Sequence, residues 1–357
     1  MTETTSQQLP TVAFLGLGHM GGPMAVNLVK ARVSVTAFDV VPAAMDAARE
    51  HGLTVAETPE DAVRQAQVVI TMFPSGQHVK DAYTGAGGGE GLLAAAPAGA
   101  TFLDCSTINI SEAQEAAALA REKGFTAADA PVSGGVVGAT AGTLAFMVGA
   151  PDEVFERVQP LLEIMGARVV HCGGNGMGQA AKICNNMVLG VSMVAVSEAF
   201  VLAEKLGLEH QALYDVVSNA SGQCWALTTN CPVPGPVPTS PANNDYEPGF
   251  AGALMAKDLN LAATALEQTG ATAPMGRLAA ELYNRFVADG HAGKDFSEII
   301  TTLREGSREG GSPPRGHGAR SAPPRPPPPR APRVRCPGRA ARSAPSWHGP
   351  PRPGRWG

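Results

Sequence analysis

Short apolar runs alternate with polar and amphipathic stretches through the first half of the chain. These runs lie at 11–15, 33–38, 68–73, 101–103, 127–130, 144–148 and 168–171. Helical patterns separate the earlier runs, for example at 59–65 and 111–123. Alternation of this kind predicts an α/β domain, in which helices cover both faces of a mainly parallel, doubly wound sheet.

The strand pattern stops beyond Gly178. A long helix is predicted at 179–206, and shorter helices follow at 209–218, 250–268, 274–289 and 295–304. We therefore expect an all-helical second domain, joined to the first through the long helix. The apolar run at 187–197 is shorter than the roughly 20 residues of a membrane span and is interpreted as a buried helix core. The proline- and asparagine-rich segment 231–248 is predicted to be an ordered, functional loop of the helical domain.

These patterns divide the chain into an extension at 1–10, an α/β domain at 11–173, a helical domain at 174–304 and a tail at 305–357. The tail holds 14 of the 30 prolines and 11 arginines against two acidic residues, and its composition predicts disorder. It resembles the product of GC-rich codons read in another frame, or a basic arm that binds nucleic acid. Removing its charge of +9 from the formal net of −5 leaves −14 on the body, which argues against a nucleic-acid-binding core.

The six cysteines form no C-x-x-C pair and no zinc-ligand pairing with histidine, so we expect reduced thiols and no metal site. The first ten residues carry no signal or transit pattern. A cytoplasmic enzyme without a membrane partner is the expectation.

The first apolar run leads directly into a glycine loop that opens a helix. Gly16 allows a tight turn, Gly18 allows close approach of a pyrophosphate, and Gly21 allows close packing of the helix on the strand. Asp39 ends the next strand, where it would accept hydrogen bonds from the ribose hydroxyls and repel a 2′-phosphate. The pattern predicts a Rossmann-type domain that binds NAD rather than NADP. The candidate cofactor ligands of the loop are Gly16, Leu17, Gly18, His19, Met20 and Gly21.

The segment from Phe14 to Lys30 resembles the N-terminal signature of the β-hydroxyacid dehydrogenase family. Arg32 departs from that signature, because it stands where the family usually has a helix-ending glycine. A residue other than glycine in a left-handed C-cap costs on the order of 1 kcal/mol, so we expect slight local strain.

Two further stretches are similar to motifs of this family. The stretch from Asp129 to Thr143 resembles the substrate-binding motif, in which Ser133, Gly134 and Gly135 could turn backbone N–H groups and a hydroxyl toward a carboxylate. The stretch from Gly174 to Asn186 resembles the catalytic motif, whose lysine is Lys182 here. Lys182 and Asn186 are four residues apart and share one helix face. Apolar neighbours and the helix N-terminus should lower the pKa of this lysine toward the range that acid–base catalysis needs.

The resemblance also implies cofactor contacts outside the glycine loop. The segment around Lys257 is similar to the family's later lysine motif, whose lysine reaches the cofactor. Phe73, Pro74 and Thr107 follow strand ends, where ligands of doubly wound sheets bind.

The stretch from Ser221 to Leu227, with the proline-rich segment after it, favours one activity within the family. It resembles the members that oxidise 3-hydroxyisobutyrate to methylmalonate semialdehyde in valine breakdown, rather than those that act on tartronate semialdehyde. Trp225 could form an apolar wall against the substrate methyl group, or it could be a core or subunit-interface aromatic.

We therefore expect a homodimer or homotetramer that oxidises a small 3-hydroxy acid with NAD. A tartronate or succinic semialdehyde reductase, a non-catalytic NAD-binding module and a basic-arm binding protein are the alternatives.

Overall fold

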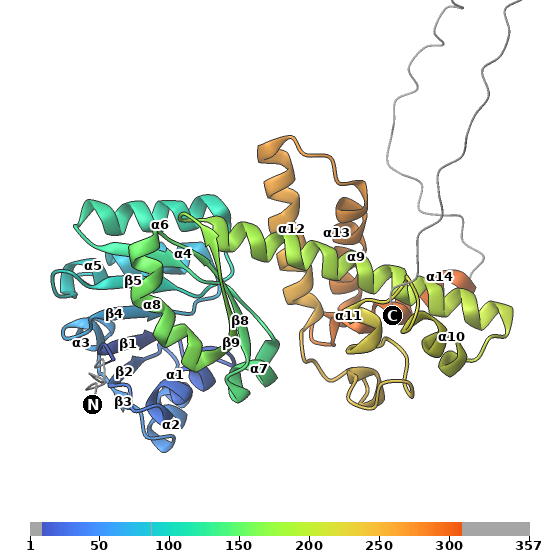
Figure 1. Ribbon diagram of the computed structural model, residues 1–357, viewed down its shortest axis with the longest axis horizontal. Helices are drawn as coiled ribbons and strands as arrows, with labels where there is room; N and C mark the ends of the chain where they lie inside the picture. Colours follow the sequence, from blue (N-terminus) through green and yellow to red (C-terminus); the bar gives the residue numbers. More distant parts are fainter. Residues whose placement is uncertain (1–8, 87, 309–357) are drawn as a thin grey trace, which may run out of the picture. The chain divides into compact units, whose positions relative to one another are not determined.

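The computed structural model describes residues 9–86 and 88–308. Most of the predicted extension and the predicted tail from residue 309 onward lie outside these described residues. The strands of the first half lie together at one side, and the long helix α9 (Met177–Leu206) leads from them to the later helices (Figure 1).

The described residues form one sheet of nine strands. The strands are β1 (Val12–Leu15), β2 (Val35–Phe38), β3 (Thr54–Val55), β4 (Val68–Thr71), β5 (Thr101–Asp104), β6 (Thr126–Asp129), β7 (Val132–Ser133), β8 (Leu144–Gly149) and β9 (Gly166–Gly173). Their order is β3-β2-β1-β4-β5-β6-β8-β7, with β9 paired to β8. The first six are parallel, and β8 is antiparallel to both β6 and β7. The prediction of a mainly parallel, doubly wound sheet is confirmed, although the two-residue strands β3 and β7 were too short to be predicted.

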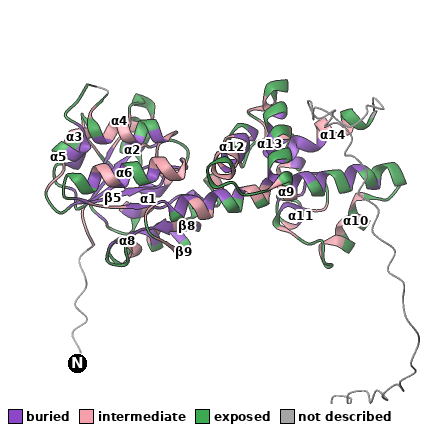
Figure 2. Ribbon diagram, turned by 90° about the horizontal axis from the view of Figure 1, so that it is seen from above, coloured by how far each residue is buried: buried purple, intermediate pink, exposed green. Residues whose placement is uncertain are grey.

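Helices cover both faces of this sheet. They are α1 (Gly21–Lys30), α2 (Pro42–Glu50), α3 (Pro59–Val63), α4 (Gly76–Thr84), α5 (Leu92–Ala95), α6 (Ile110–Glu122), α7 (Gly135–Ala141) and α8 (Asp152–Met165). Successive residues of β1 belong to different cores, because side chains alternate across a strand. Val12 and Phe14 pack in one cluster, whereas Ala13 and Leu15 pack in another. Figure 2 shows β5 as buried and the outer surfaces of the covering helices as exposed.

The second half is helical, as predicted. It consists of α9, α10 (His210–Val217), α11 (Trp225–Thr228), α12 (Gly252–Thr269), α13 (Pro274–Phe286) and α14 (Ile299–Arg308), with short 3-10 turns at Pro241–Asn243 and Phe296–Glu298 and a π-turn at Val287–His291. Their core gathers around Phe200, Tyr283, Phe286 and Phe296, all fully buried. The predicted loop at 231–248 packs onto it, where the Tyr246 hydroxyl donates to the Pro232 carbonyl.

The last helix ends four residues later than predicted. Helix α14 continues to Arg308 instead of ending at 304. It packs along α9, and Arg304 forms a bidentate ion pair with Glu204 of that helix, with a shortest distance of 2.6 Å. The last helix therefore runs past the point where the composition changes.

The left-handed conformation expected of Arg32 is confirmed, with φ at 65°. The Val33 N–H donates to the Leu28 carbonyl and the Arg32 N–H to the Val29 carbonyl, which is the bonding of a helix C-cap that usually carries glycine.

Helix α9 is long and apolar enough to cross a membrane by length and composition alone. Half of its most apolar stretch is nevertheless buried within the protein. It packs against α11, α12, α13 and α14, and it carries the buried polar side chains of Gln179, Asn186 and Ser197. Helix α9 is therefore a core helix of this protein, as predicted, and it extends beyond the apolar run at 187–197 on both sides.

Candidate active site

The glycine loop lies where the strand order reverses, between β1 and β4. Gly16 has φ of +94°, and a Cβ there would collide with the Met72 carbonyl. A Cβ at Gly18 would meet nothing within 4 Å. Gly21 begins α1 so close to the loop that a Cβ would collide with the Gly16 carbonyl. The loop is thus shaped by its glycines and open at Gly18.

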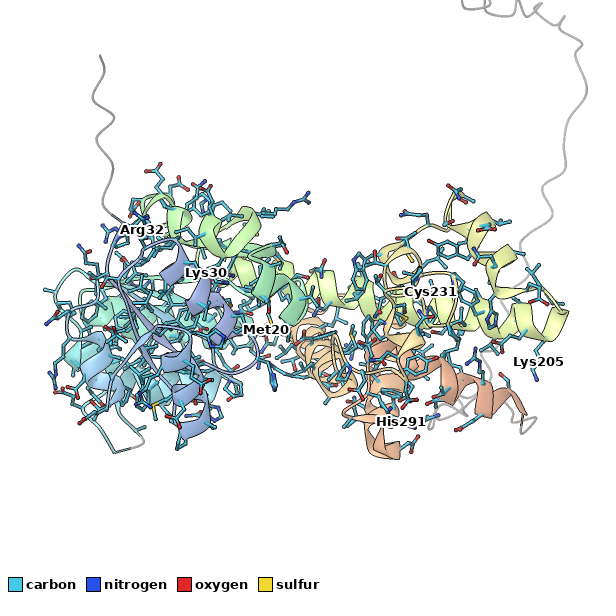
Figure 3. The ribbon with its side chains drawn as sticks, turned by 90° about the horizontal axis from the view of Figure 1, so that it is seen from below. Met20, Lys30, Arg32, Lys205, Cys231 and His291 are labelled. Carbon is cyan, nitrogen blue, oxygen red and sulfur yellow. The ribbon has the colours of Figure 1, made fainter. Side chains whose placement is uncertain are left out.

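Helix α1 presents its N-terminus at this opening. Its N-cap is Met20, and no side chain caps the first turn. Gly18 and His19 are exposed and Met20 is half-buried. Figure 3 labels Met20, the N-cap of α1, and Lys30, the last residue of this helix. Uncapped N–H groups with open space before them fit the pyrophosphate of a dinucleotide.

Asp39 reaches the same loop from the end of β2. Its Oδ2 accepts from the Leu17 N–H at 2.5 Å, and its Oδ1 accepts from the Val41 N–H at 2.8 Å. Each carboxylate oxygen can accept more than one hydrogen bond, so lone pairs are left for a ribose. Asp39 therefore holds the glycine loop in addition to the role predicted for it.

The loops after β4 and β5 are tied together beside the glycine loop. The half-buried Phe73 ring packs against Gly16, and its backbone N–H donates to Ser106 Oγ at 2.7 Å. Ser106 Oγ in turn donates to Asp104 Oδ1 at 2.6 Å. Burial raises the pKa of Asp104 above its ordinary value. Pro74 is exposed at the rim.

Lys182 and Asn186 lie on one buried face of α9, as predicted, with 6% and 1% of their surfaces exposed. Asn186 Nδ2 donates to Asp258 Oδ2 on α12 at 2.5 Å. Burial lowers the pKa of Lys182, the charge of Asp258 opposes that shift, and the charge of Lys257 adds to it. Burial likewise raises the pKa of Asp258. The site therefore holds one buried lysine and one buried carboxylate that favour each other's charged forms.

Lys257 connects the helical half to the strand-end loops. Its Nζ donates to the Thr107 carbonyl at 2.6 Å, across 150 positions of sequence. The cofactor-side loop after β5 and the Asp258 carboxylate therefore meet at the same end of α12.

The predicted carboxylate-binding turn also faces the helical half. Ser133 ends β7 and pairs with Ala145 of β8, and Gly134 and Gly135 have φ of +127° and +61°. A Cβ at Gly135 would lie 3.1 Å from the carbonyl of Gly249, just before α12. The first turn of α9 packs on β8 at Met147, two residues from Ala145 and so about 7 Å along the strand.

Trp225 is the first residue of α11. Its side chain is 52% exposed on α11, so the alternative of a core aromatic is wrong. Helix α11 packs against α9. Its role at the substrate stays a prediction.

Sequence reasoning gave no role to Asp104 or Asp258 and did not identify Gln179. Asp258 directly follows Lys257, and Asp104 ends a buried strand two residues before Ser106. Their positions are visible in the sequence, but their burial and partners are not.

Other features of the described residues lie outside this site. A cavity of about 680 Å³ is lined by Gln67, Gly99 and Arg157 at the amino-terminal ends of β4 and β5, the end opposite the glycine loop. The described residues contain no group of three or more His, Cys, Asp or Glu that could hold a metal ion.

A doubly wound sheet with a glycine loop at its switch point, followed by helices that bring a buried lysine to the strand ends, defines an NAD-dependent oxidoreductase of hydroxy acids. Comparison with family models agrees. Residues 11–174 match the NAD-binding domain of 6-phosphogluconate dehydrogenase, and residues 176–303 match a domain described as the NAD-binding domain of NADP-dependent 3-hydroxyisobutyrate dehydrogenase.

The chain belongs to the 3-hydroxyisobutyrate dehydrogenase family. It is 55% identical over 296 residues to a probable 3-hydroxyisobutyrate dehydrogenase of Mycobacterium tuberculosis, which covers 83% of this chain and 98% of that protein. It is 45% identical over 288 residues to an NAD-dependent L-serine dehydrogenase of Pseudomonas aeruginosa, with 81% and 96% covered. A solved structure of the M. tuberculosis 3-hydroxyisobutyrate dehydrogenase with L-serine superposes with a TM-score of 0.79 and covers 83% of this chain and 99% of that one. These relatives favour this family over the semialdehyde reductases and the non-catalytic module.

Proposed function

We propose that this protein oxidises 3-hydroxyisobutyrate to methylmalonate semialdehyde with NAD, and that Lys182 is the general base. The observation that carries the proposal is the buried Lys182, which lies with Asn186 and Asp258 beside the loop that Lys257 ties to α12. A lysine whose pKa is lowered by burial can give up its proton at a lower pH than an ordinary lysine, as acid–base exchange with an alcohol requires.

Each group of the site has a distinct task in this proposal. The turn Ser133–Gly135 binds the substrate carboxylate through its hydroxyl and backbone N–H groups. Lys182 accepts the hydroxyl proton, and Asn186 orients the substrate against it. Asp258 stabilises the ammonium that results. NAD, when bound, supplies the hydride acceptor.

We propose that the glycine loop, Phe73, Pro74, Thr107 and Lys257 line the cofactor, and that Asp39 selects NAD over NADP. The Asp39 carboxylate lies at the loop that would receive the adenosine ribose, and a 2′-phosphate there would meet a like charge. The family matched by residues 176–303 is described as NADP-dependent. Comparing kcat/KM with NAD and with NADP therefore tests this preference directly.

L-serine is the second candidate substrate, because the L-serine dehydrogenase is a 45% identical relative and L-serine is bound in the solved M. tuberculosis structure. Serine and 3-hydroxyisobutyrate share a carboxylate and a primary alcohol and differ in an ammonium or a methyl at C2. Lys182 is influenced by the charges of Lys257 and Asp258, so the proposed site holds two lysines and one carboxylate, and a neutral methyl should be accepted more readily than an ammonium.

A substrate panel tests the proposal. We expect the highest kcat/KM with 3-hydroxyisobutyrate and NAD and a lower value with L-serine. We expect little reduction of tartronate or succinic semialdehyde by NADH. Nicotinamide absorbance follows the reaction in both directions. A higher kcat/KM for L-serine would reverse the order of the two substrates. Turnover of the semialdehydes alone would refute the proposal.

Three wider assignments accompany it as proposals. We propose that the protein acts in valine breakdown, that it works in the cytoplasm, and that it forms a homodimer or homotetramer. The division between its domains is proposed at 173/174, where β9 ends and the turn into α9 begins.

A further inference from the structure

The carboxylate of Asp129 has no task in the mechanism above, yet it is buried at the carboxyl end of β6 with 3% of its surface exposed. Its Oδ1 accepts from the Gly176 N–H at 2.6 Å, and its Oδ2 accepts from the Gln179 N–H at 3.0 Å. Both donors belong to the start of α9, whose N-cap is Gly176. A carboxylate from another strand thus caps the helix that carries Lys182.

The surroundings of Asp129 are shaped to hold it there. A Cβ on Gly149 would lie 2.5 Å from Asp129 Oδ1, and a Cβ on Gly178 would lie 2.8 Å from Oδ2. Asn175 Nδ2 ties the turn before the helix to the Ala127 carbonyl of the same strand at 2.8 Å. Glycine at both flanking positions therefore allows the helix to approach the carboxylate directly.

A second buried side chain fixes the same turn to the cofactor side. Gln179 Nε2 donates to the Ser106 carbonyl at 2.7 Å, and Gln179 Oε1 accepts from the Ile108 N–H at 3.2 Å. The residue between these two is Thr107, whose carbonyl receives Lys257. Lys182 lies three residues after Gln179, on the same side of α9.

We propose that Asp129 is a positioning residue that sets the placement of Lys182 by anchoring the first turn of α9 to β6. The negative charge also interacts favourably with the positive end of a 30-residue helix. The inference rests on the proposed role of Lys182 as the acid–base group. Asp129 contacts neither the glycine loop nor Asp39 in the described hydrogen bonds, so it acts on proton transfer and not on cofactor binding.

Asp129→Asn is the direct test, because the amide keeps the shape but offers one acceptor in place of two. A misplacement of about 1 Å can cost about 10²-fold in rate, so we expect kcat to fall by about 10- to 100-fold. The Kd for NAD, measured by fluorescence titration, should stay within about twofold. A loss in the Kd equal to the loss in kcat would overturn the proposal.

Thr126→Val is the matched control for a merely structural effect. Thr126 begins the strand that Asp129 ends, and its hydroxyl bonds Thr101 Oγ1 at 2.8 Å. The control should lower the thermal midpoint without lowering kcat. If Thr126→Val lowers kcat as much as Asp129→Asn at a similar loss of stability, the positioning role is wrong.

The pH profile of the reductive direction gives a readout that loss of stability does not move. There the ammonium of Lys182 is the proton donor, so its ionisation lowers kcat as pH rises, whereas protonation of Asp129 would lower kcat as pH falls. Burial raises the pKa of Asp129 to about 6. The two backbone N–H donors oppose this shift, and the charge of Asp104 on β5 adds to it. The thiol of Cys172 on β9 is the other titratable neighbour, and burial raises its pKa above the range of this profile.

Protonated Asp129 no longer presents two acceptors, so wild-type kcat for reduction should fall as pH drops through about 6. Asp129→Asn should lack that ionisation. If the variant keeps it, the proposal is wrong. A fully active Lys182→Ala would refute the proposed function as well as this inference. An inactive Lys182→Ala together with a fully active Asp129→Asn would refute this inference alone.

Discussion

Neutralising Asp258 should move the pH dependence of alcohol oxidation toward lower pH. In the proposed mechanism Lys182 accepts the proton as a free amine, so kcat for oxidation rises with pH through the pKa of Lys182. The Asp258 carboxylate favours the ammonium and raises that pKa against the effect of burial. Asp258→Asn removes the charge and keeps an oxygen that can accept from Asn186. The pKa of Lys182 then falls, and the acid limb of the profile shifts to lower pH.

The size of the shift follows from the pairing of the two buried groups. An opposite charge within a few ångströms typically shifts a pKa by about 1–3 units, and each unit corresponds to about 1.4 kcal/mol. We therefore expect the midpoint to fall by about 1–3 pH units. Lys257→Gln should act in the opposite direction, because the charge of Lys257 lowers the pKa of Lys182. That shift should be about 1 unit or less, and glutamine keeps a donor for the Thr107 carbonyl.

Stopped-flow measurement of nicotinamide absorbance at saturating NAD and substrate gives the profiles. Asp215→Asn is the matched control, because it removes the same charge from an exposed position on α10, where salt screens it. Its midpoint should equal that of the wild type. The reasoning is refuted if Asp258→Asn and Lys257→Gln shift the midpoint in the same direction, or if Asp215→Asn shifts it as far as Asp258→Asn.

Three further predictions follow from the fold and the site. Lys182→Ala should lower kcat by about 10²–10⁴-fold with little change in the Kd for NAD. Lys182→Arg should be no more active, because a guanidinium keeps its proton. Near-normal rates of either variant in single-turnover assays would contradict this prediction. Asp39→Ser with Val40→Arg should raise the ratio of kcat/KM with NADP to kcat/KM with NAD by at least about tenfold. The double variant should also bind NAD more weakly, because Asp39 holds the glycine loop. Val40→Arg alone should leave the preference for NAD. A chain ending at Arg308 should match the full chain in activity and melting temperature. In that shortened chain, Arg32→Gly should raise the free energy of unfolding by about 1 kcal/mol. A melting midpoint unchanged by the glycine would exclude strain at this cap.

Much of the fold could be predicted because hydrophobic periodicity is a local property. The run 11–15 contains β1, and the turn after it needs glycine at Gly16, where φ is +94°. Helix ends were less certain, because they depend on contacts distant in sequence. Helix α14 runs to Arg308 instead of ending at 304, and the ion pair that ties it to α9 joins residues 100 positions apart.

The site divides in the same way. Lys182 and Asn186 are placed on one face by helix geometry alone, since residues four apart are neighbours on any helix. Their partner Asp258 lies 72 positions from Asn186, and the bond between them exists only because α12 packs against α9. Trp225 shows the converse, because a sequence resemblance gave it a role that its exposed position on α11 does not by itself support.

The sequence by itself determined the glycine loop, the acidic end of β2, the alternation of the longer strands with helices, and the helix that carries the lysine. Each of these follows from backbone conformation or side-chain spacing within a few residues. Tertiary structure alone decided that Lys182 is buried beside Asp258, that Asp129 caps α9 and that Lys257 reaches Thr107. Burial and charge pairing set the chemistry of a titratable group, and both depend on which distant segments pack around it.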